Sequence, residues 1–145
     1  MATLTEILLQ PARRPQLIGD CVQLVDDEVA SKSGLTGLAV KAAYAIVKRL
    51  KPGIIREAVD SLLDEFVSRL DPFYANCLKD GANIEAFFAS RTETIANALL
   101  GVTDVKAARA KNKTIKSAYE KLRPTGVKHT AAAVPGIARL IRKHV

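Results

Sequence analysis

The segment from Gly34 to Leu70 carries the densest apolar pattern in the chain. Its first fourteen residues are mostly small and apolar, and Lys41 is the single charged residue among them. Its second part repeats large apolar residues at spacings of three and four, which is typical of one helical face. These residues are Ile55, Val59, Leu62, Leu63, Phe66 and Leu70. With residues 51–53 (KPG) as the turn, we expect a central helical hairpin over residues 34–70, in which small residues let the helices approach closely.

Two shorter helices are predicted before this hairpin. Residues 3–6 (TLTE) have the sequence of a capping box, in which the Thr hydroxyl and the Glu carboxylate each accept from a free backbone N–H group. A helix is therefore expected to begin there and to end before Pro11. Pro15 suits the first turn of a second helix, where a missing N–H group costs little. Asp26, Asp27 and Glu28 on that helix are expected to point largely to water.

The remaining helices are predicted from turn and capping signals. Residues 71–72 (DP) predict that a helix restarts there, and Asn83 predicts the cap of a short helix. Residues 90–93 (SRTE) resemble a second capping box, and Gly101 suits the C′ position at the end of that helix. The next helix is predicted from residue 103 or 104 to about 122. The last is predicted from residue 127, unless Pro135 delays its start.

No stretch alternates between apolar and polar residues as a half-buried strand would, and no internal repeat is visible. A chain of 145 residues is long enough for one domain with a substantial core. The sequence therefore predicts an all-α fold. We expect a single compact domain over residues 1–145, with seven or eight helices around the hairpin.

Composition points to a soluble protein of the cytoplasm. Hydrophobic residues make up 48% of the chain and charged residues 26%, a globular balance, and no apolar run reaches the roughly 20 residues of a membrane span. Cys21 and Cys77 form no CxxC pair, so we expect two free thiols in a reducing compartment. No basic segment precedes the first apolar run, as it would in a signal peptide.

Positive charge is concentrated in the basic C-terminal third, residues 105–145. This segment holds eleven Lys and Arg residues against one acid, Glu120, for a net charge of +10, while residues 1–104 carry −3. These eleven are the candidate surface for a polyanion or another partner. They are Lys106, Arg109, Lys111, Lys113, Lys116, Lys121, Arg123, Lys128, Arg139, Arg142 and Lys143.

Three uses of this basic segment are open. It can bind nucleic acid or another polyanion, although stacking aromatics are scarce, with Tyr119 alone and at a core spacing. It can also be a solvated surface that partly offsets the acids of residues 1–104. The last helix has apolar and cationic faces like those of helices on anionic membranes, but packing onto the core is the commoner use, so membrane binding is the least favoured.

No motif for catalysis or metal binding is recognisable. Glu57, Asp60 and Asp64 share a helical face, but it lies opposite the apolar stripe, which favours exposed charge over acid–base chemistry. His129 and His144 have neither HExxH spacing nor a neighbouring cysteine, so no zinc site is predicted. No nucleophile elbow or phosphate-binding loop is present. We therefore expect no enzymatic activity and no cofactor.

Several strings spread along nearly the whole chain carry a resemblance. They are LLQPARRP (8–15), LVDDEVASKSGLTG (24–37), KAAYAIVKRLKPGI (41–54), LLDEF (62–66), ALLGVTDVKAAR (98–109) and AYEKLRP (118–124). On these strings the chain resembles a family of small bacterial proteins of unknown function. The resemblance implies an all-helical single domain and supplies no catalytic or binding residues. The function that we expect is non-enzymatic binding, to a protein partner, a second copy of the chain, or a polyanion.

Overall fold

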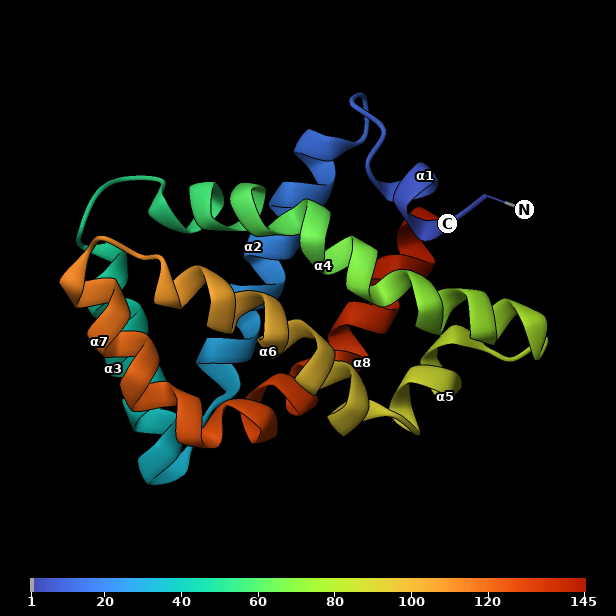
Figure 1. Ribbon diagram of the computed structural model, residues 1–145. Coiled ribbons are helices and arrows are strands. Elements are labelled where there is room, and N and C mark those ends of the chain that lie inside the picture. Colours follow the sequence, from blue (N-terminus) through green and yellow to red (C-terminus); the bar gives the residue numbers. More distant parts are fainter. Residues whose placement is uncertain (1) are drawn as a thin grey trace.

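The computed structural model describes residues 2–145, and in that range the chain folds into eight α-helices and one short 3₁₀ turn, with no strand. The all-α prediction is therefore confirmed (Figure 1). The helices are α1 (Leu4–Leu8), α2 (Arg14–Ser31), α3 (Gly34–Lys48), α4 (Ile54–Lys79), α5 (Ile84–Ala89), α6 (Thr92–Ala108), α7 (Lys113–Leu122) and α8 (Gly126–His144), and the turn is η1 (Arg123–Thr125).

The core lies where α4, α6 and α8 meet, and α1, α5 and the first turns of α2 complete it. α8 packs along α6 and α5, while α4 carries α1 on one side and α6 on another (Figure 1). The most deeply buried large side chains come from all of these helices, and they are mainly aliphatic. They are Phe88, Leu4, Leu17, Ile95, Ile141, Val102, Val134 and Cys77.

The helical hairpin forms, but it is not the centre of the core. The turn lies where it was expected, with Gly53 in the left-handed region at φ 76°. α3, however, buries only Gly37, and its Leu35 and Leu38 are 88% and 61% exposed. α3 packs mainly on α7 and α2 rather than on α4 (Figure 1). The large apolar residues of α4 face α1, α2 and α6 instead.

Two helix boundaries differ from the sequence prediction, because α4 continues through Pro72 and α6 continues through Gly101. α8 begins at Gly126 and continues through Pro135, so of the two predicted starts the earlier one is correct to within one residue. Proline removes a backbone donor and glycine adds chain entropy, so each weakens a helix locally. In each case buried side chains on both sides of the residue hold the helix together, as Leu70 and Tyr74 do around Pro72.

Two of the predicted caps are present and one is absent. The Thr3 capping box and the Asn83 cap form as expected. The second capping box does not form, because α6 follows Arg91 and the Ser90 hydroxyl instead donates to the carbonyl of Phe87. The break expected near residues 101–104 lies further along the chain, where the side chain of Asn112 caps α7.

Candidate functional site

An apolar cavity of about 460 Å³ lies among α2, α4, α6 and α8. Aliphatic side chains form nearly all of its surface. The main lining residues are Leu24, Val25 and Val29 of α2, Ile55, Val59, Leu62 and Phe66 of α4, Leu99 and Leu100 of α6, and Ala133, Ile137 and Leu140 of α8. Many of these residues were expected in the core, yet Val25, Val59 and Phe66 are only half-buried. Their apolar surface faces the cavity.

Small side chains help to leave this space open. Ala58 of α4 and Ala133 of α8 line the cavity at positions where a larger residue would reach into it. The chain is also poor in bulky residues, with no Trp and only 5% aromatic residues. The space is half-open to solvent, and its volume lies within the range of small-molecule sites.

The polar residues of the cavity wall gather near the end of α2 and the start of α8. They are Glu28, Lys32, His129 and Thr130, and Thr103 of α6 is also part of the wall. The ammonium Nζ of Lys32 lies 3.5 Å from Oε2 of Glu28 and 3.4 Å from the carbonyl oxygen of His129. The Lys32 side chain is only 10% exposed. The Lys32 ammonium group is thus buried beside Glu28 and the His129 carbonyl, at the border of an almost entirely apolar space.

His129 has an unused polar atom in this region. Its Nε2 is buried and has no hydrogen-bond partner among residues 2–145. Burial lowers the pKa of His129, and the positive charges of Lys32 and Lys128 lower it further. The lowered pKa favours the neutral imidazole at pH 7, and its buried Nε2 is a polar atom whose hydrogen-bonding capacity is unused within residues 2–145.

The sequence alone did not reveal this polar group, although helical spacing carried a signal. His129, Ala133, Ile137 and Leu140 follow one another at intervals of three and four, so His129 belongs to the apolar stripe of α8. The prediction that Glu28 points to water is wrong. Glu28 lies in the cavity wall, and its side chain is only 23% exposed. The residue that closes this end, Lys32, follows α2 directly.

The eleven candidate basic residues fall into two groups. Four of them pair with acids of residues 1–104, as the offsetting alternative predicted: Lys106 with Glu65, Arg123 with Asp104, Arg142 with Glu85 and Lys143 with Asp20. The other seven form no ion pair within 4.0 Å in the described part of the chain. They are Arg109, Lys111, Lys113, Lys116, Lys121, Lys128 and Arg139.

Five of these seven lie on or beside α7, which packs along α3 (Figure 1). α3 has no acidic residue and α7 has one, Glu120. We call the exposed cations on or near these two helices that form no ion pair in the described part of the chain the α3–α7 layer. Its members are Lys41, Arg49, Arg109, Lys111, Lys113, Lys116 and Lys121, none of which is in an ion pair within residues 2–145.

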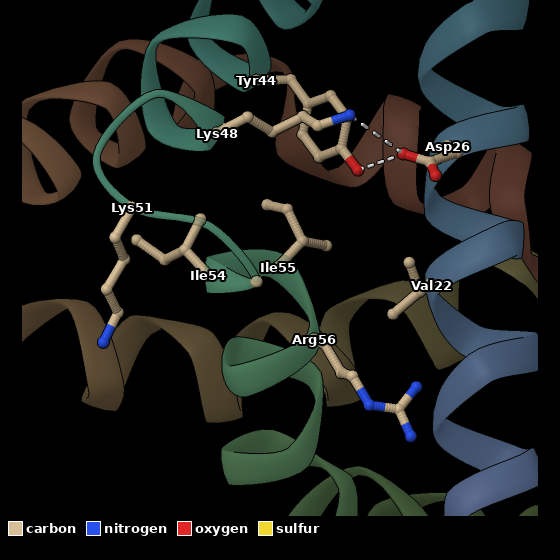
Figure 2. Close-up of a pocket in the computed structure, with 9 residues that line it drawn as sticks. Val22, Asp26, Tyr44, Lys48, Lys51, Ile54, Ile55 and Arg56 are labelled. Carbon is tan, nitrogen blue, oxygen red and sulfur yellow. Dashed lines mark hydrogen bonds and ion pairs between the residues drawn. The ribbon is translucent and has the colours of Figure 1, made fainter.

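A smaller pocket of about 200 Å³ separates α2 from the end of α3 and the start of α4 (Figure 2). The Tyr44 hydroxyl donates to Asp26, and Lys48 Nζ lies 3.9 Å from Oδ1 of Asp26 and 5.2 Å from the centre of the Tyr44 ring. Burial raises the pKa of Tyr44, and its bond to Asp26 raises it further. The polar groups therefore satisfy one another and tie α2 to α3.

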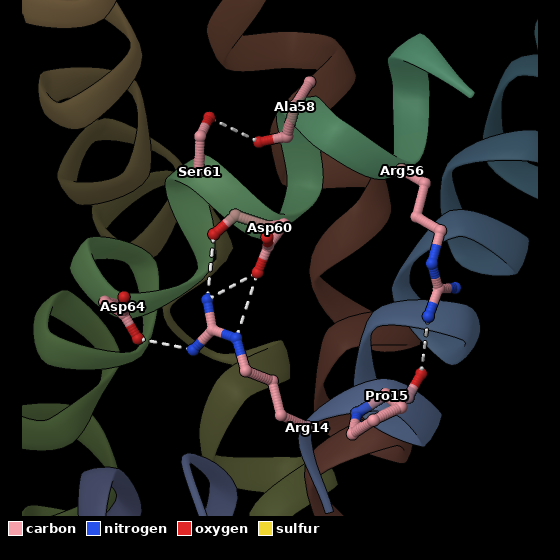
Figure 3. Close-up of polar contacts among 7 residues, drawn as sticks. All are labelled: Arg14, Pro15, Arg56, Ala58, Asp60, Ser61 and Asp64. Carbon is pink, nitrogen blue, oxygen red and sulfur yellow. Dashed lines mark hydrogen bonds and ion pairs between the residues drawn. The ribbon is translucent and has the colours of Figure 1, made fainter. Parts of the chain in front are cut away.

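The three acids considered for acid–base chemistry, Glu57, Asp60 and Asp64, form ion pairs on the surface of α4. Arg14 of α2 donates to Oδ1 of Asp60 at 2.8 Å and to Oδ1 of Asp64 at 2.7 Å (Figure 3). Glu57 pairs with Lys51 at 2.7 Å. All three carboxylates thus have a cationic partner, as structural surface charges do.

The two histidines lie in separate environments. His144 is buried, with Nε2 2.7 Å from Oδ2 of Asp20, whereas His129 lies at the cavity. Within residues 2–145, no group of three or more His, Cys, Asp and Glu side chains could hold a metal ion. None of the helices described is long and apolar enough to cross a membrane.

Comparison with known proteins places the chain in a family. Residues 4–145 match the family described as "Family of unknown function (DUF6918)". The chain belongs to the DUF6918 family. The match includes all eight helices, so the whole cavity lies inside the DUF6918 domain. No curated protein and no solved structure matches the chain.

Proposed function

We propose that this protein binds an elongated apolar small molecule in the cavity among α2, α4, α6 and α8. The observation that supports the proposal is the 460 Å³ apolar space with a few polar groups at one end. Ligand sites are typically about 300–1,000 Å³, mostly apolar, and orient their ligand with a small number of polar side chains. The role is binding rather than catalysis.

The lining predicts how affinity depends on the ligand. Each methylene group moved from water into the cavity contributes about 0.8 kcal/mol, which is about fourfold in Kd. Affinity should therefore rise stepwise with alkyl chain length and level off once the cavity is full. A surface that binds apolar molecules without a defined cavity would show no such limit.

A cavity-filling variant tests this proposal. Ala133 lines the cavity, while its neighbour Ala132 on α8 is exposed, so Ala133→Phe and Ala132→Phe add the same ring in two environments. Calorimetric titration with alkyl compounds of increasing length should show binding to the natural protein and to Ala132→Phe. Binding to Ala133→Phe should be at least tenfold weaker, while its thermal midpoint is retained. Equal binding by both variants would contradict the cavity as the site.

A second candidate function is polyanion binding by the α3–α7 layer. It is supported by the seven exposed and unpaired cations of that layer, whose two helices contain one acidic residue between them, Glu120. Phosphates bound there would release counterions, so affinity should fall steeply as salt concentration rises. Exposed Leu35 and Leu38 on α3 supply apolar contacts for the alternative of a protein partner or a second copy of the chain.

Charge reversal tests the second candidate. We expect duplex DNA to shift in an electrophoretic assay at low salt, and Lys113→Glu with Lys116→Glu to abolish the shift. Arg69→Glu with Lys79→Glu, on exposed positions of α4, reverses the same charge elsewhere and should preserve it. Co-sedimentation with anionic vesicles in place of DNA binding would redirect the proposal to a membrane surface. No binding to either at low salt would reject it.

We also propose that the protein works in the cytoplasm. The support is that Cys21 and Cys77 are both free thiols, as is usual in a reducing compartment. Fractionation of cells that express the protein, followed by immunodetection, would test the location. Recovery in a membrane or extracellular fraction would contradict it.

A further inference from the structure

Resting on the proposed function, we infer that the bound molecule is a long-chain carboxylate whose head group binds between Lys32 and His129. The polar groups of the cavity wall are concentrated there, where α2 ends and α8 begins. The rest of the wall is aliphatic and suits the alkyl chain. The cavity therefore has polar residues at one end and apolar residues elsewhere, as a fatty acid has a polar head and an apolar chain.

The charges around this end of the cavity favour an anion. α2 and the residue that follows it contribute Glu28 and Lys32, and α8 contributes Lys128 beside His129. The side chains of Arg139 and Glu28 also come near each other beside Gly136 of α8. Arg139 Nη2 and Glu28 Oε1 each lie 3.6 Å from the position that a Cβ would take on Gly136. Lys32 lies in the cavity wall, while Lys128 and Arg139 are exposed and lie outside it, so positive charge exceeds negative charge in this region. α4 and α6 add no charged residue to the part of the wall that the structure describes.

The hydrogen-bonding capacity of the two key residues is incompletely used. The Lys32 ammonium group has three donors, and its contacts with Glu28 and with the His129 carbonyl are long, at 3.5 and 3.4 Å. His129 Nε2 has no partner within residues 2–145. A carboxylate offers two acceptor oxygens, one to each residue, and a bond to a charged donor is the stronger kind.

Gly37 fixes the position of Lys32. A Cβ on Gly37 would lie 2.9 Å from the backbone carbonyl carbon of Lys32 and 3.1 Å from its Cβ. The first turn of α3 therefore packs directly against the backbone that carries the ammonium group. This contact holds Lys32 at the cavity wall rather than on a mobile surface segment.

The test compares head groups on one alkyl chain. Hexadecanoic acid, its methyl ester, and hexadecyl phosphate are titrated below their aggregation concentrations into the full-length protein at pH 7. We expect the acid to bind at least tenfold more tightly than the ester. The acid is a charged carboxylate at pH 7, whereas the ester carries no charge for the Lys32 ammonium group to attract. Tighter binding of the phosphate than of the acid would overturn the assignment of a carboxylate.

Substitution of Lys32 tests which residue makes this distinction. Lys32→Met should abolish the preference for the acid over the ester. Circular dichroism of the variant shows separately whether it is folded. Lys32→Arg should retain the preference. Lys41→Met removes an exposed cation of α3 as the matched control and should behave as the natural protein.

The possible failures are distinct from one another. If the acid and the ester bind equally to the natural protein, the head-group inference is wrong and the apolar binding function stands. If the preference persists in Lys32→Met, Lys32 is not the head-group residue and the inference is also wrong. If none of the three compounds binds, the proposed function itself fails.

Discussion

Asp20 is the residue through which the end of α8 is held against α2. Its Oδ2 lies 2.7 Å from Nε2 of His144 and 3.0 Å from Nζ of Lys143. The bond from His144 lowers the pKa of Asp20, burial opposes this shift, and Lys143 lowers the pKa further. Arg13 also donates to the carbonyl oxygen of His144. One carboxylate and one guanidinium group thus anchor the last turn of the fold.

The lowered pKa of Asp20 predicts a loss of stability in acid. A carboxylate whose pKa falls on folding stabilises the native state above its unfolded pKa of about 3.9, and this contribution is lost as pH falls through the lower folded pKa. We expect Asp20→Asn to lower the free energy of unfolding by about 1–2 kcal/mol at pH 7. The difference should vanish at a pH below the folded pKa of Asp20. Urea titrations across this range measure it.

An exposed aspartate on the same helix provides the control. Asp27 accepts from Gln23 but is not in an ion pair within residues 2–145, so Asp27→Asn should change stability little at any pH. A cost for Asp20→Asn that stayed constant from neutral to strongly acid pH would contradict the role of its charge.

At the scale of the helices, two glycines with similar surroundings in the sequence have opposite roles. Gly101 lies inside α6 with nothing within 4 Å of where a Cβ would be, whereas a Cβ on Gly37 of α3 would meet the backbone of Lys32 at 2.9 Å. Glycine costs a helix about 0.5–1 kcal/mol relative to alanine. Gly101 therefore lowers the stability of α6, whereas Gly37 allows α3 to pack closely against the backbone of Lys32.

Alanine at each position should change stability in opposite directions. We expect Gly101→Ala to raise the free energy of unfolding by about 0.5–1 kcal/mol. We expect Gly37→Ala to lower it, because the backbone near Lys32 must move. Thermal denaturation of the two variants measures both effects. A Gly37→Ala protein as stable as Gly101→Ala would show that the contact at Lys32 is not tight.

The sequence predicted the helices better than it predicted their packing. Spacing and caps located α1, α2, α5 and the turn at Gly53, because these signals are local. The pattern on α3 did not reveal that Leu35 and Leu38 stay exposed, because which neighbour covers a stripe depends on the whole fold. The same holds for the cavity, where apolar stripes were recognised and the space between them was not.

Boundaries were missed where tertiary packing overrode a local breaker. Pro72 and Pro135 each remove a backbone donor from a helix interior, which costs about 3 kcal/mol in isolation. Both are exposed, and the helices continue because their opposite faces are buried. His129 was considered only for a zinc site, which its spacing did not support, and its place on the α8 stripe at the cavity was missed.

At the scale of the whole molecule, α8 closes the core. It is the main packing partner of both α6 and α5, and it contributes Val134, Ala138 and Ile141, which are at most 1% exposed. It also supplies one wall of the cavity and four of the candidate basic residues at its last turns and start. Helices distant in the sequence therefore depend on α8 for their buried surface.

A fragment of residues 1–125, which lacks α8, should therefore not fold. The apolar faces of α5 and α6 would lose their main cover, and burial of large aliphatic side chains is the dominant source of stability. Circular dichroism should show no cooperative thermal transition for this fragment. Addition of a synthetic peptide of residues 126–145 should restore one. A cooperative transition of the fragment alone would contradict the role of α8.

The anchor between Asp20 and His144 has a consequence for synthesis of the protein on the ribosome. The two residues are 124 positions apart, so translation at about 5–20 residues per second leaves the nascent chain incomplete for on the order of ten seconds. During that interval, the apolar faces of α2, α4 and α6 have no α8 to cover them. We therefore expect the growing polypeptide to keep this apolar surface exposed until the final helix emerges.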